Sequence, residues 1–478
     1  MRTQVAEKST HPVISYLIAY LKDFRVLRET RIEYWALQIV NFLDCTIFFA
    51  MLNIATVMLS DDFGFSDKQA GWVLTAFSSG TTICLLFSGL VTDWLGIRVS
   101  MYVAMGAMLL LRVVVVWVGL DHSVPFRGTI VTGAFILMAP FMAMIQTMFQ
   151  AANKRFTTGK SRSAGFNLWY LFMNVGAAAG GFLIDIVRLW LELPNAHIFT
   201  YGVFAAVASI VMTLFFIRRE EQLYGPSEQP AVPAAAAEPV KRLSPWENFT
   251  RVMASQVFWR FTILITLLLG VRAVFAYMYL LFPKYWLRVI GPDAKMGTLQ
   301  AINPILIIFG LIVLIPILHR FNVYKMLVYG AMISALSLFI MAIPSYGVET
   351  YYVSIAALIA LSIGELIWSP RLTEYTAAIA PEGQEGVYLG LSMLPWFFAK
   401  MYVSFFSGYW LERFVPELPE GELLRDRLAA GAVSFWDSPS ALWIYLGIPA
   451  ILGPLVALLF KSFFTKGAKF EKSAAAAH

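Results

Sequence analysis

Twelve apolar runs, each about twenty residues or longer, alternate with polar loops along the sequence. A helix rises about 1.5 Å per residue, so a run of this length spans the hydrocarbon core of a bilayer. Inside lipid the backbone must satisfy its own hydrogen bonds, and a helix does so without partners. We therefore predict an all-α, polytopic membrane protein with twelve transmembrane helices near 33–59, 67–91, 99–120, 128–150, 164–187, 197–217, 257–286, 297–318, 326–344, 351–374, 386–411 and 440–462.

The composition agrees with a membrane protein and argues against several other classes. Hydrophobic residues make up 59% of the chain and charged residues 14%, whereas soluble chains are nearer half apolar and a quarter charged. The two cysteines, Cys45 and Cys84, lie in apolar runs, which leaves no disulfide framework and no zinc-ligand spacing. No glycine-rich phosphate loop occurs, so ATP-driven transport finds no support. We expect no enzymatic activity, no cofactor and no metal site.

A polar, proline-containing segment divides the runs into six and six. It extends over 218–255 and includes Pro230, Pro233 and Pro239, a composition typical of a mobile linker. Two similar helix bundles around a linker are a common layout of secondary transporters. The predicted units are a cytoplasmic amphipathic N-terminus over 1–31, six-helix bundles over 32–217 and 256–462, the linker, and a cytoplasmic tail over 463–478 whose last residues resemble a vector-derived remnant.

Basic residues gather in the loops on one side of the predicted bilayer. They occur over 154–162, in the linker and in the tail, and the same side carries the N-terminus. Because cytoplasmic loops are enriched in Lys and Arg, we expect both termini in the cytoplasm and the protein in the plasma (inner) membrane. The opposite side carries acidic residues, with Lys284, Arg288 and Lys295 as exceptions.

The loop after the second run combines two glycines with two opposite charges. Gly89, Asp93, Gly96 and Arg98 give the spacing G-x-x-x-D-x-x-G-x-R. Gly89 would let two helix ends approach closely, and Gly96 can adopt a left-handed backbone conformation. The spacing resembles the signature loop between helices 2 and 3 of the major facilitator superfamily. The resemblance implies alternating access by two six-helix halves, with this gating loop bracing the cytoplasmic helix ends in the outward-open state.

Five ionisable side chains fall near the middle of predicted helices: Asp44, Arg112, Arg272, Glu365 and Lys400. Charges at membrane depth are costly, so each of them is a functional candidate.

Other spacings favour structural roles. Arg371 with Glu374, and Asp185 with Arg188, are three residues apart on one helix, and we interpret both as local pairs. Gly176 and Gly180, flanked by alanines, predict a close helix contact.

Glu365 is the strongest of the five candidates. Pro370 follows it closely and is expected to break or bend the helix, and a carboxylate beside a broken turn can meet an ammonium group or hold a proton. Three stretches resemble the proton-coupled oligopeptide transporters: Gly364-Glu365-Leu366 with Ser369-Pro370, Ala380-Pro381, Gly386 and Gly390; Gln300 with Asn303-Pro304; and Phe166, Tyr170, Asn174 and Gly176. The resemblance implies that Glu365 receives the amino terminus of a peptide.

The first helix departs from that family. It lacks the E-x-x-E-R cluster that couples protons and holds the peptide carboxylate, and it has Asp44 as its one carboxylate at this depth. The fourth run also lacks a lysine at mid-membrane depth. A cation for a substrate carboxylate must therefore come from elsewhere, and Arg272 is our first choice.

We predict a proton-coupled symporter of small peptides or similar zwitterionic solutes, driven by the proton gradient. Asp44 and Glu365 would couple protons, and the substrate would contact Arg272, Glu365, Asn303, Tyr277, Trp396, Asn174 and Lys400. One alternative is an organic-anion facilitator or exchanger that uses Arg272, Arg112 and Lys400. Another is a non-transporting nutrient sensor on a transporter scaffold. The expected partners are the solute, protons and the lipid bilayer; nucleic acid is not expected, and the chain is expected to be a monomer.

Overall fold

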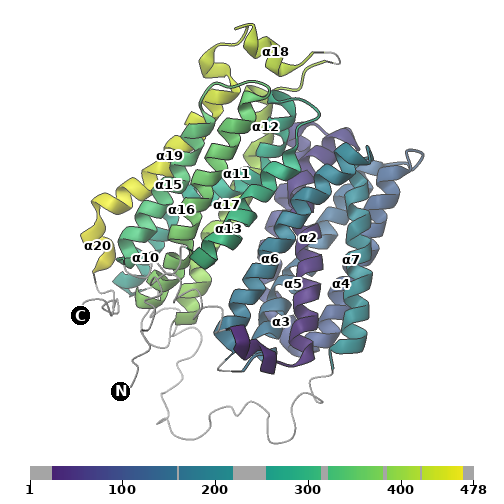
Figure 1. Ribbon diagram of the computed structural model, residues 1–478, viewed down its shortest axis with the longest axis vertical. Helices are drawn as coiled ribbons and strands as arrows, with labels where there is room; N and C mark the ends of the chain where they lie inside the picture. The colour runs from purple at the N-terminus through teal and green to yellow at the C-terminus, as the bar shows by residue number, and fades with distance from the viewer. Residues whose placement is uncertain are drawn as a thin grey trace, which may run out of the picture.

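The computed structural model describes residues 24–158, 161–218, 254–313, 321–379, 385–419 and 422–466. Within these ranges the chain is helical and contains no strand, which confirms the predicted all-α class (Figure 1). Most of the predicted amphipathic N-terminus, linker and tail lie outside the described residues.

The first six predicted runs are each a helix. They are preceded by the short helix η1 (Phe24–Glu29), and two short segments, η2 (Ile186–Trp190) and η3 (Asn195–His197), precede the last of them. The helices are α2 (Ile32–Asp61), α3 (Asp67–Leu95), α4 (Ile97–Leu120), α5 (Arg127–Phe156), α6 (Arg162–Asp185) and α7 (Ile198–Phe216).

The second set of runs forms the other half of the molecule, and its first run is divided into three helices. Pro283 lies in the first turn of the third of these, where its missing N–H interrupts the helical hydrogen bonds. The helices are α10 (Gln256–Leu267), α11 (Leu269–Leu280), α12 (Phe282–Val289), α13 (Met296–Val313), α15 (Val323–Met341), α16 (Glu349–Ile379), α17 (Glu385–Phe414), α18 (Leu424–Ala429), η4 (Phe435–Asp437), α19 (Pro439–Leu459) and α20 (Lys461–Thr465).

Ten helical segments of the described chain are long and apolar enough to cross a membrane. The helices α13 and α17 coincide with the remaining two predicted runs, so the described helices are compatible with the predicted twelve spans. The chain is therefore an integral membrane protein.

Local sequence explains where several helices begin. Ser66 and Gln69 form a reciprocal capping box at the start of α3, in which each side chain accepts a hydrogen bond from the other residue's backbone N–H. At the starts of α15 and α19, the Asn322 and Ser438 side chains each accept one hydrogen bond, from the backbone N–H three residues later. Gly96 joins α3 to α4 with φ of +76°, a backbone angle that other residues rarely adopt.

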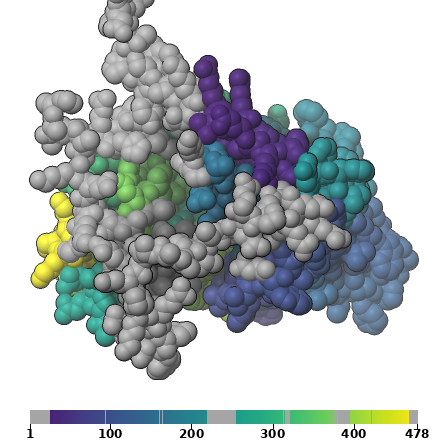
Figure 2. All heavy atoms as spheres, turned by 90° about the horizontal axis from the view of Figure 1, so that it is seen from below, coloured from purple at the N-terminus to yellow at the C-terminus, as the bar shows by residue number. Residues whose placement is uncertain are grey.

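The two halves lie side by side, and each end of the bundle has a distinct set of helix termini (Figure 1). We call one the α12 end, where α2 ends, α3 begins and α12 lies, and the other the termini end, where α2 begins and α19 ends. Seen from the termini end, the purple and blue atoms of the first half and the green and yellow atoms of the second lie on opposite sides (Figure 2).

Glycines set the closest helix contacts. A Cβ atom at Gly176 would lie 2.9 Å from both the Phe42 carbonyl oxygen and the Cys45 Cβ, and one at Gly180 would lie 2.5 Å from the Thr46 carbonyl oxygen. The predicted close contact of this glycine pair is thus confirmed, and its partner is α2. Gly181 makes a similar contact across the two halves, since its Cβ would lie 2.5 Å from the Gly297 carbonyl oxygen on α13.

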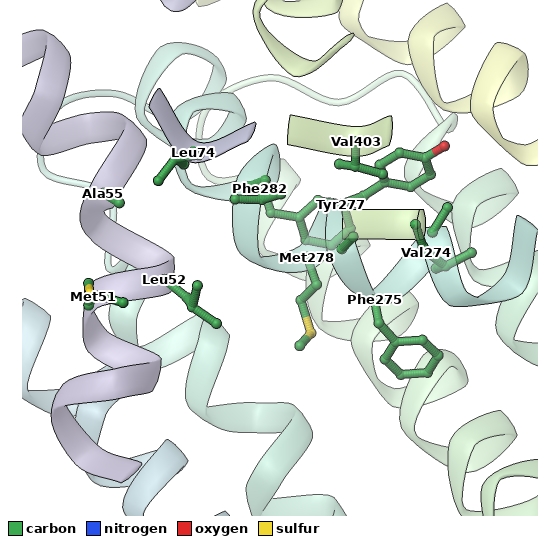
Figure 3. Close-up of a cluster of buried hydrophobic side chains, with 14 of the residues drawn as sticks. Met51, Leu52, Ala55, Leu74, Val274, Phe275, Tyr277, Met278, Phe282 and Val403 are labelled. Carbon is green, nitrogen blue, oxygen red and sulfur yellow. The ribbon is translucent and has the colours of Figure 1, made fainter. Parts of the chain in front are cut away.

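A buried apolar cluster also joins the halves. Figure 3 shows side chains of α2 and α3 lying near those of α11, α12 and α17. The labelled members are Met51, Leu52, Ala55, Leu74, Val274, Phe275, Tyr277, Met278, Phe282 and Val403.

Gly180→Ala is expected to lower the free energy of unfolding by about 1–3 kcal/mol, because the added methyl group meets backbone atoms of α2 that cannot move aside. Gly106→Ala on α4 is the matched control, since a Cβ there meets no atom within 4 Å and alanine favours a helix. Thermal unfolding of both variants in detergent measures the difference. Equal midpoints would show that the α2–α6 contact is not tight.

Candidate functional site

Glu365 lies near the middle of α16 and is half-buried. The Asn303 Nδ2 donates a hydrogen bond to Glu365 Oε2 at 3.0 Å and lies 3.0 Å from Ser362 Oγ, so α13 holds the carboxylate in place. The expected helix break at Pro370 is not seen, because α16 continues through it. A proline removes one backbone hydrogen bond, and the neighbouring turns keep theirs.

Arg272 lies on α11, and its guanidinium carbon is 4.6 Å from the Trp368 ring centroid and 6.0 Å from that of Trp396. Within the described chain it makes no side-chain hydrogen bond or ion pair. It lies near Glu365, with which it forms no ion pair. The structure therefore brings together two opposite charges that do not form an ion pair.

Aromatic side chains surround these two charges. Tyr170 of α6 lies near both Glu365 and Arg272, and Tyr279 of α11 lies near Glu365. Trp368 was not predicted as a contact, although its three-residue spacing from Glu365 places both on one helix face.

Lys400 lies on α17, and its Nζ is 4.6 Å from the centroid of the Trp396 ring. It lines a pocket between the halves together with Ser78 and Thr82 of α3 and Gln146 of α5. No hydrogen bond or ion pair of its ammonium group is found among the described residues. Five of the predicted contacts are thus found in two neighbouring groups. Asn303 binds the Glu365 carboxylate, and Arg272 and Lys400 both lie near the Trp396 ring.

Asn174 and Tyr277 are placed differently. The Asn174 side chain donates to the Tyr170 carbonyl oxygen at 2.9 Å, one turn earlier on α6, so it borders the site through Tyr170. Tyr277 is buried in the apolar cluster of Figure 3, with its ring 5.7 Å from that of Trp410. The structure does not bring Tyr277 to Arg272.

Asp44 and Arg112 form a separate buried ion pair inside the first half. Arg112 Nη2 lies 3.0 Å from Asp44 Oδ1, and the two side chains are 2% and 4% exposed. Arg112 also donates to the Gly202 carbonyl oxygen at 3.0 Å. The structure therefore separates these two candidates from Glu365 and neutralises each with the other.

The gating loop is described in part. Arg98 donates to the Leu214 carbonyl oxygen at 3.3 Å, at the end of α7, and the Asp93 side chain lies outside the described part of the chain. Gly96 has the expected positive φ. The close approach expected at Gly89 is not seen, because a Cβ there would meet no atom within 4 Å.

The two expected local pairs have different outcomes. Arg371 and Glu374 form an ion pair, as predicted. Asp185 and Arg188 do not: the Asp185 carboxylate accepts hydrogen bonds from the backbone N–H groups of Gly297 and Thr298, at 2.9 and 2.7 Å. These are unpaired amides at the N-terminus of α13, where a carboxylate is favoured. Asp185 thus joins the halves.

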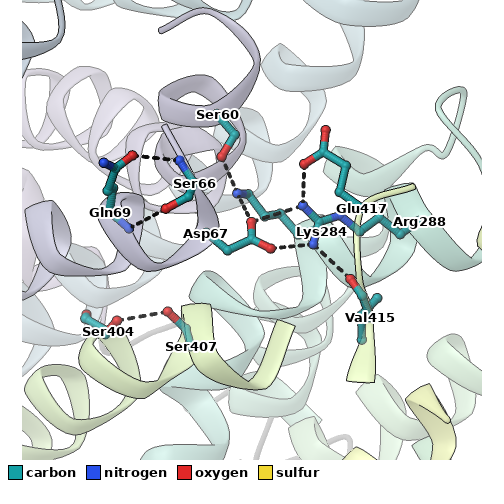
Figure 4. Close-up of polar contacts among 10 residues, drawn as sticks. All are labelled: Ser60, Ser66, Asp67, Gln69, Lys284, Arg288, Ser404, Ser407, Val415 and Glu417. Atoms are coloured by element: carbon teal, nitrogen blue, oxygen red, sulfur yellow. Dashed lines mark hydrogen bonds and ion pairs between the residues drawn. The ribbon is translucent and has the colours of Figure 1, made fainter. Parts of the chain in front are cut away.

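A second contact between the halves lies at the α12 end and was not predicted. Asp67 at the start of α3 is 2.5 Å from Lys284 and 2.6 Å from Arg288, both on α12 (Figure 4). The side chains of Asp67 and Lys284 are 5% and 4% exposed. Arg288 also pairs with Glu417 at 3.0 Å. We call Asp67, Lys284, Arg288 and Glu417 the gate cluster.

The sequence did contain a signal for the gate cluster. Lys284 and Arg288 were exceptions to the distribution of basic residues among the loops, and their ion pairs with Asp67 explain why cations lie at this end. Together with Lys68–Glu412 and Asp185–α13, the gate cluster holds the two halves together at the α12 end.

Comparison with known proteins identifies the family. The profile of the Major Facilitator Superfamily matches residues 35–414, so the chain belongs to this superfamily of transporters. It is therefore a transporter and not an enzyme. The comparison with curated proteins finds no sequence match.

Solved structures share the fold at low sequence identity. One is described as "Structural insights into substrate recognition in proton dependent oligopeptide transporters", with 15% identity, a TM-score of 0.68 and coverage of 91% of this chain and 99% of that chain. A second, "Selectivity mechanism of a bacterial homologue of the human drug peptide transporters PepT1 and PepT2", has 16% identity, a TM-score of 0.66 and the same coverage. A peptide transporter in complex with sulfate has 13% identity and a TM-score of 0.65, and the match covers 92% of this chain and 96% of that chain.

Asp67→Asn is expected to open the α12 end more often, because Lys284 and Arg288 then lack their shared carboxylate and breaking a buried ion pair costs about 3–5 kcal/mol. A single cysteine in place of Ser404, buried on α17, reports the opening in a background without Cys45 and Cys84. We expect alkylation by a membrane-impermeant maleimide to be at least about tenfold faster.

Asp121→Asn is the matched control, because Asp121 is half-buried at the same end and accepts hydrogen bonds from Ser123 in its own turn. Its alkylation rate should equal that of the parent protein. An unchanged rate in Asp67→Asn would mean that the gate cluster does not hold the α12 end closed.

Proposed function

We propose that this transporter is a proton-coupled symporter of small peptides or similar zwitterionic solutes. One observation carries the proposal: Glu365 and Arg272, on helices far apart in the sequence, carry opposite charges in the second half, yet no ion pair joins them in the described chain. Two unpaired opposite charges at membrane depth are costly unless a ligand completes them. The peptide-transporter descriptions of the structural neighbours support the same substrate class.

A zwitterion between these two charges would have one favourable orientation. Its ammonium group would pair with Glu365, which Asn303 orients, and its carboxylate would pair with Arg272. The planar guanidinium offers two parallel N–H donors to a carboxylate, and no described residue accepts a hydrogen bond from them. Asn174, through Tyr170, would border the bound solute from the first half, and Trp396 from the second.

Glu365 is also our proposed proton-coupling residue. The Asp44 carboxylate is tied to Arg112, which supports a structural role for Asp44 and leaves proton exchange to Glu365. A protonated Glu365 can still accept a hydrogen bond from the substrate ammonium group through its carbonyl oxygen, so the proton and the solute would cross together, as symport requires. The proton gradient is the proposed energy source, and no cofactor enters the cycle.

The gate cluster would act as the outer closure in alternating access. We propose that the termini end faces the cytoplasm, in agreement with the basic loops, and that the protein is a monomer of the plasma (inner) membrane. The α12 end, closed by the gate cluster, then faces outward, so the present conformation is closed to the outside. Gly89, Asp93, Gly96 and Arg98 would stabilise the opposite, outward-open state.

A second candidate is an organic-anion facilitator or exchanger. It is favoured by the excess of cations over carboxylates around Trp396, where Arg272 and Lys400 both lie. It requires no ammonium group on the substrate, and this separates the two proposals.

Uptake of a radiolabelled dipeptide into proteoliposomes should rise when a proton gradient is imposed and should fall when a protonophore removes it. Glu365→Gln should abolish gradient-driven uptake, because the amide cannot exchange a proton. Glu349→Gln, at the exposed start of the same helix, is the control and should transport normally. Uptake by the parent protein that ignores the gradient would rule out symport.

Arg272→Lys should raise the dissociation constant for a free dipeptide by about tenfold although the charge is kept, because lysine cannot bind a carboxylate through a planar fork. Arg260→Lys, whose parent side chain contacts Gln256 near the termini end, is the control. Binding is followed by isothermal calorimetry, with folding checked by size-exclusion chromatography. If an N-acetylated dipeptide binds the parent protein as tightly as the free one, Glu365 does not receive the amino group.

A further inference from the structure

Two cations and one carboxylate remain unpaired around Trp396 in the described chain. Arg112 has Asp44 as its partner, but Arg272 and Lys400 have no ion pair with any described carboxylate. A zwitterion between Arg272 and Glu365 satisfies one of these cations. Lys400 would remain as an uncompensated positive charge, which is costly in a site of low dielectric constant.

Lys400 is close enough to Arg272 to act on the same small molecule. The Lys400 Nζ is 4.6 Å and the Arg272 guanidinium carbon is 6.0 Å from the centroid of one ring, that of Trp396. The two charged centres therefore lie within roughly 11 Å of each other, a separation that one ligand with two anionic groups can bridge.

The surroundings of Lys400 suit an anionic group. Its pocket is lined by Ser78 and Gln146 of the first half, a hydroxyl and an amide that can donate hydrogen bonds. The Thr82 hydroxyl is already used, since it donates to the Ser78 carbonyl oxygen. The other walls include Phe48, Phe77 and Phe397, which exclude water and so strengthen a charge–charge interaction.

We propose that Lys400, with Ser78 and Gln146, forms a second carboxylate site, so that the preferred substrate is an acidic peptide of net charge −1. Its main-chain carboxylate binds Arg272, its ammonium group binds Glu365 and its side-chain carboxylate binds Lys400. The inference rests on the proposed function, because it keeps the zwitterion between the same two charges. The two cations are then balanced by two carboxylates.

The test compares Ala-Glu with Ala-Gln, which differ by a carboxylate against an amide of the same shape. Calorimetry on the full-length protein in detergent should give a dissociation constant at least about tenfold lower for Ala-Glu, as expected for a charge-assisted hydrogen bond. In Lys400→Met the ratio of the two constants should fall to about one, whereas Lys400→Arg should keep the preference. Lys325→Met, at the exposed start of α15, is the control and should retain the parent ratio.

The outcomes separate this inference from the proposed function. Equal binding of Ala-Glu and Ala-Gln to the parent protein would overturn the second carboxylate site and leave peptide transport standing. If neither dipeptide binds but glutarate does, and Lys400→Met loses it, the anion site stands and the peptide proposal fails. If Lys400→Met is unstable, Lys400→Arg and the parent ratio decide: a preference below about twofold in both would overturn the site.

Discussion

The cost of an ionised group at membrane depth governs the arrangement of this protein. Each such charge must be neutralised within the fold or left for a ligand to neutralise. Arg112 is neutralised within the fold by Asp44, which lies on another helix of the same half. Arg272, Glu365 and Lys400 form no ion pair in the described chain. The candidate site is therefore the place where charged side chains lack an ionic partner.

The contacts that close the α12 end are of two kinds. The apolar cluster of Figure 3 and the glycine contact of α6 with α13 exclude water, whereas the gate cluster and the Asp185 cap give the two halves a fixed register. Ion pairs suit a closure that must reopen, because water can replace each partner once the halves separate. A purely apolar seal would lose its full burial on opening, and breaking and remaking the closure would be slower.

Local features of the sequence were enough to predict most of the fold. Run length located the long helices of the described chain, and the spacing of Gly176 and Gly180 identified a tight contact without naming α2 as its partner. Membrane depth likewise identified five charged candidates. What depth cannot tell is which charges pair, because Asp44 on α2 meets Arg112 on α4 only when both helices pack against α7. Asp185 was assigned to a neighbour in sequence, yet its partners lie on α13 in the other half.

Helix geometry explains another difference between the predicted and observed site. Tyr277 follows Arg272 by five residues, which turns it roughly 140° around α11 and away from the charged face. Closeness in sequence suggested a shared cavity, but the period of the helix placed the tyrosine in the apolar cluster. Trp368 was overlooked for the converse reason: its spacing from Glu365 puts it on the right face, but a tryptophan in an apolar helix carries no signal of its own.

The division of charge between the halves bears on how binding would move the protein. The unpaired charges, Arg272, Glu365 and Lys400, all belong to the second half, whereas the first half offers uncharged donors and rings, among them Tyr170 and Gln146. A solute held by the charges of the second half would therefore be enclosed only when the first half approaches and excludes water from around the solute. Because removing water strengthens those ion pairs, binding would become more favourable as the halves close. The proposed site would thus connect neutralisation of its charges to the relative motion of the two bundles.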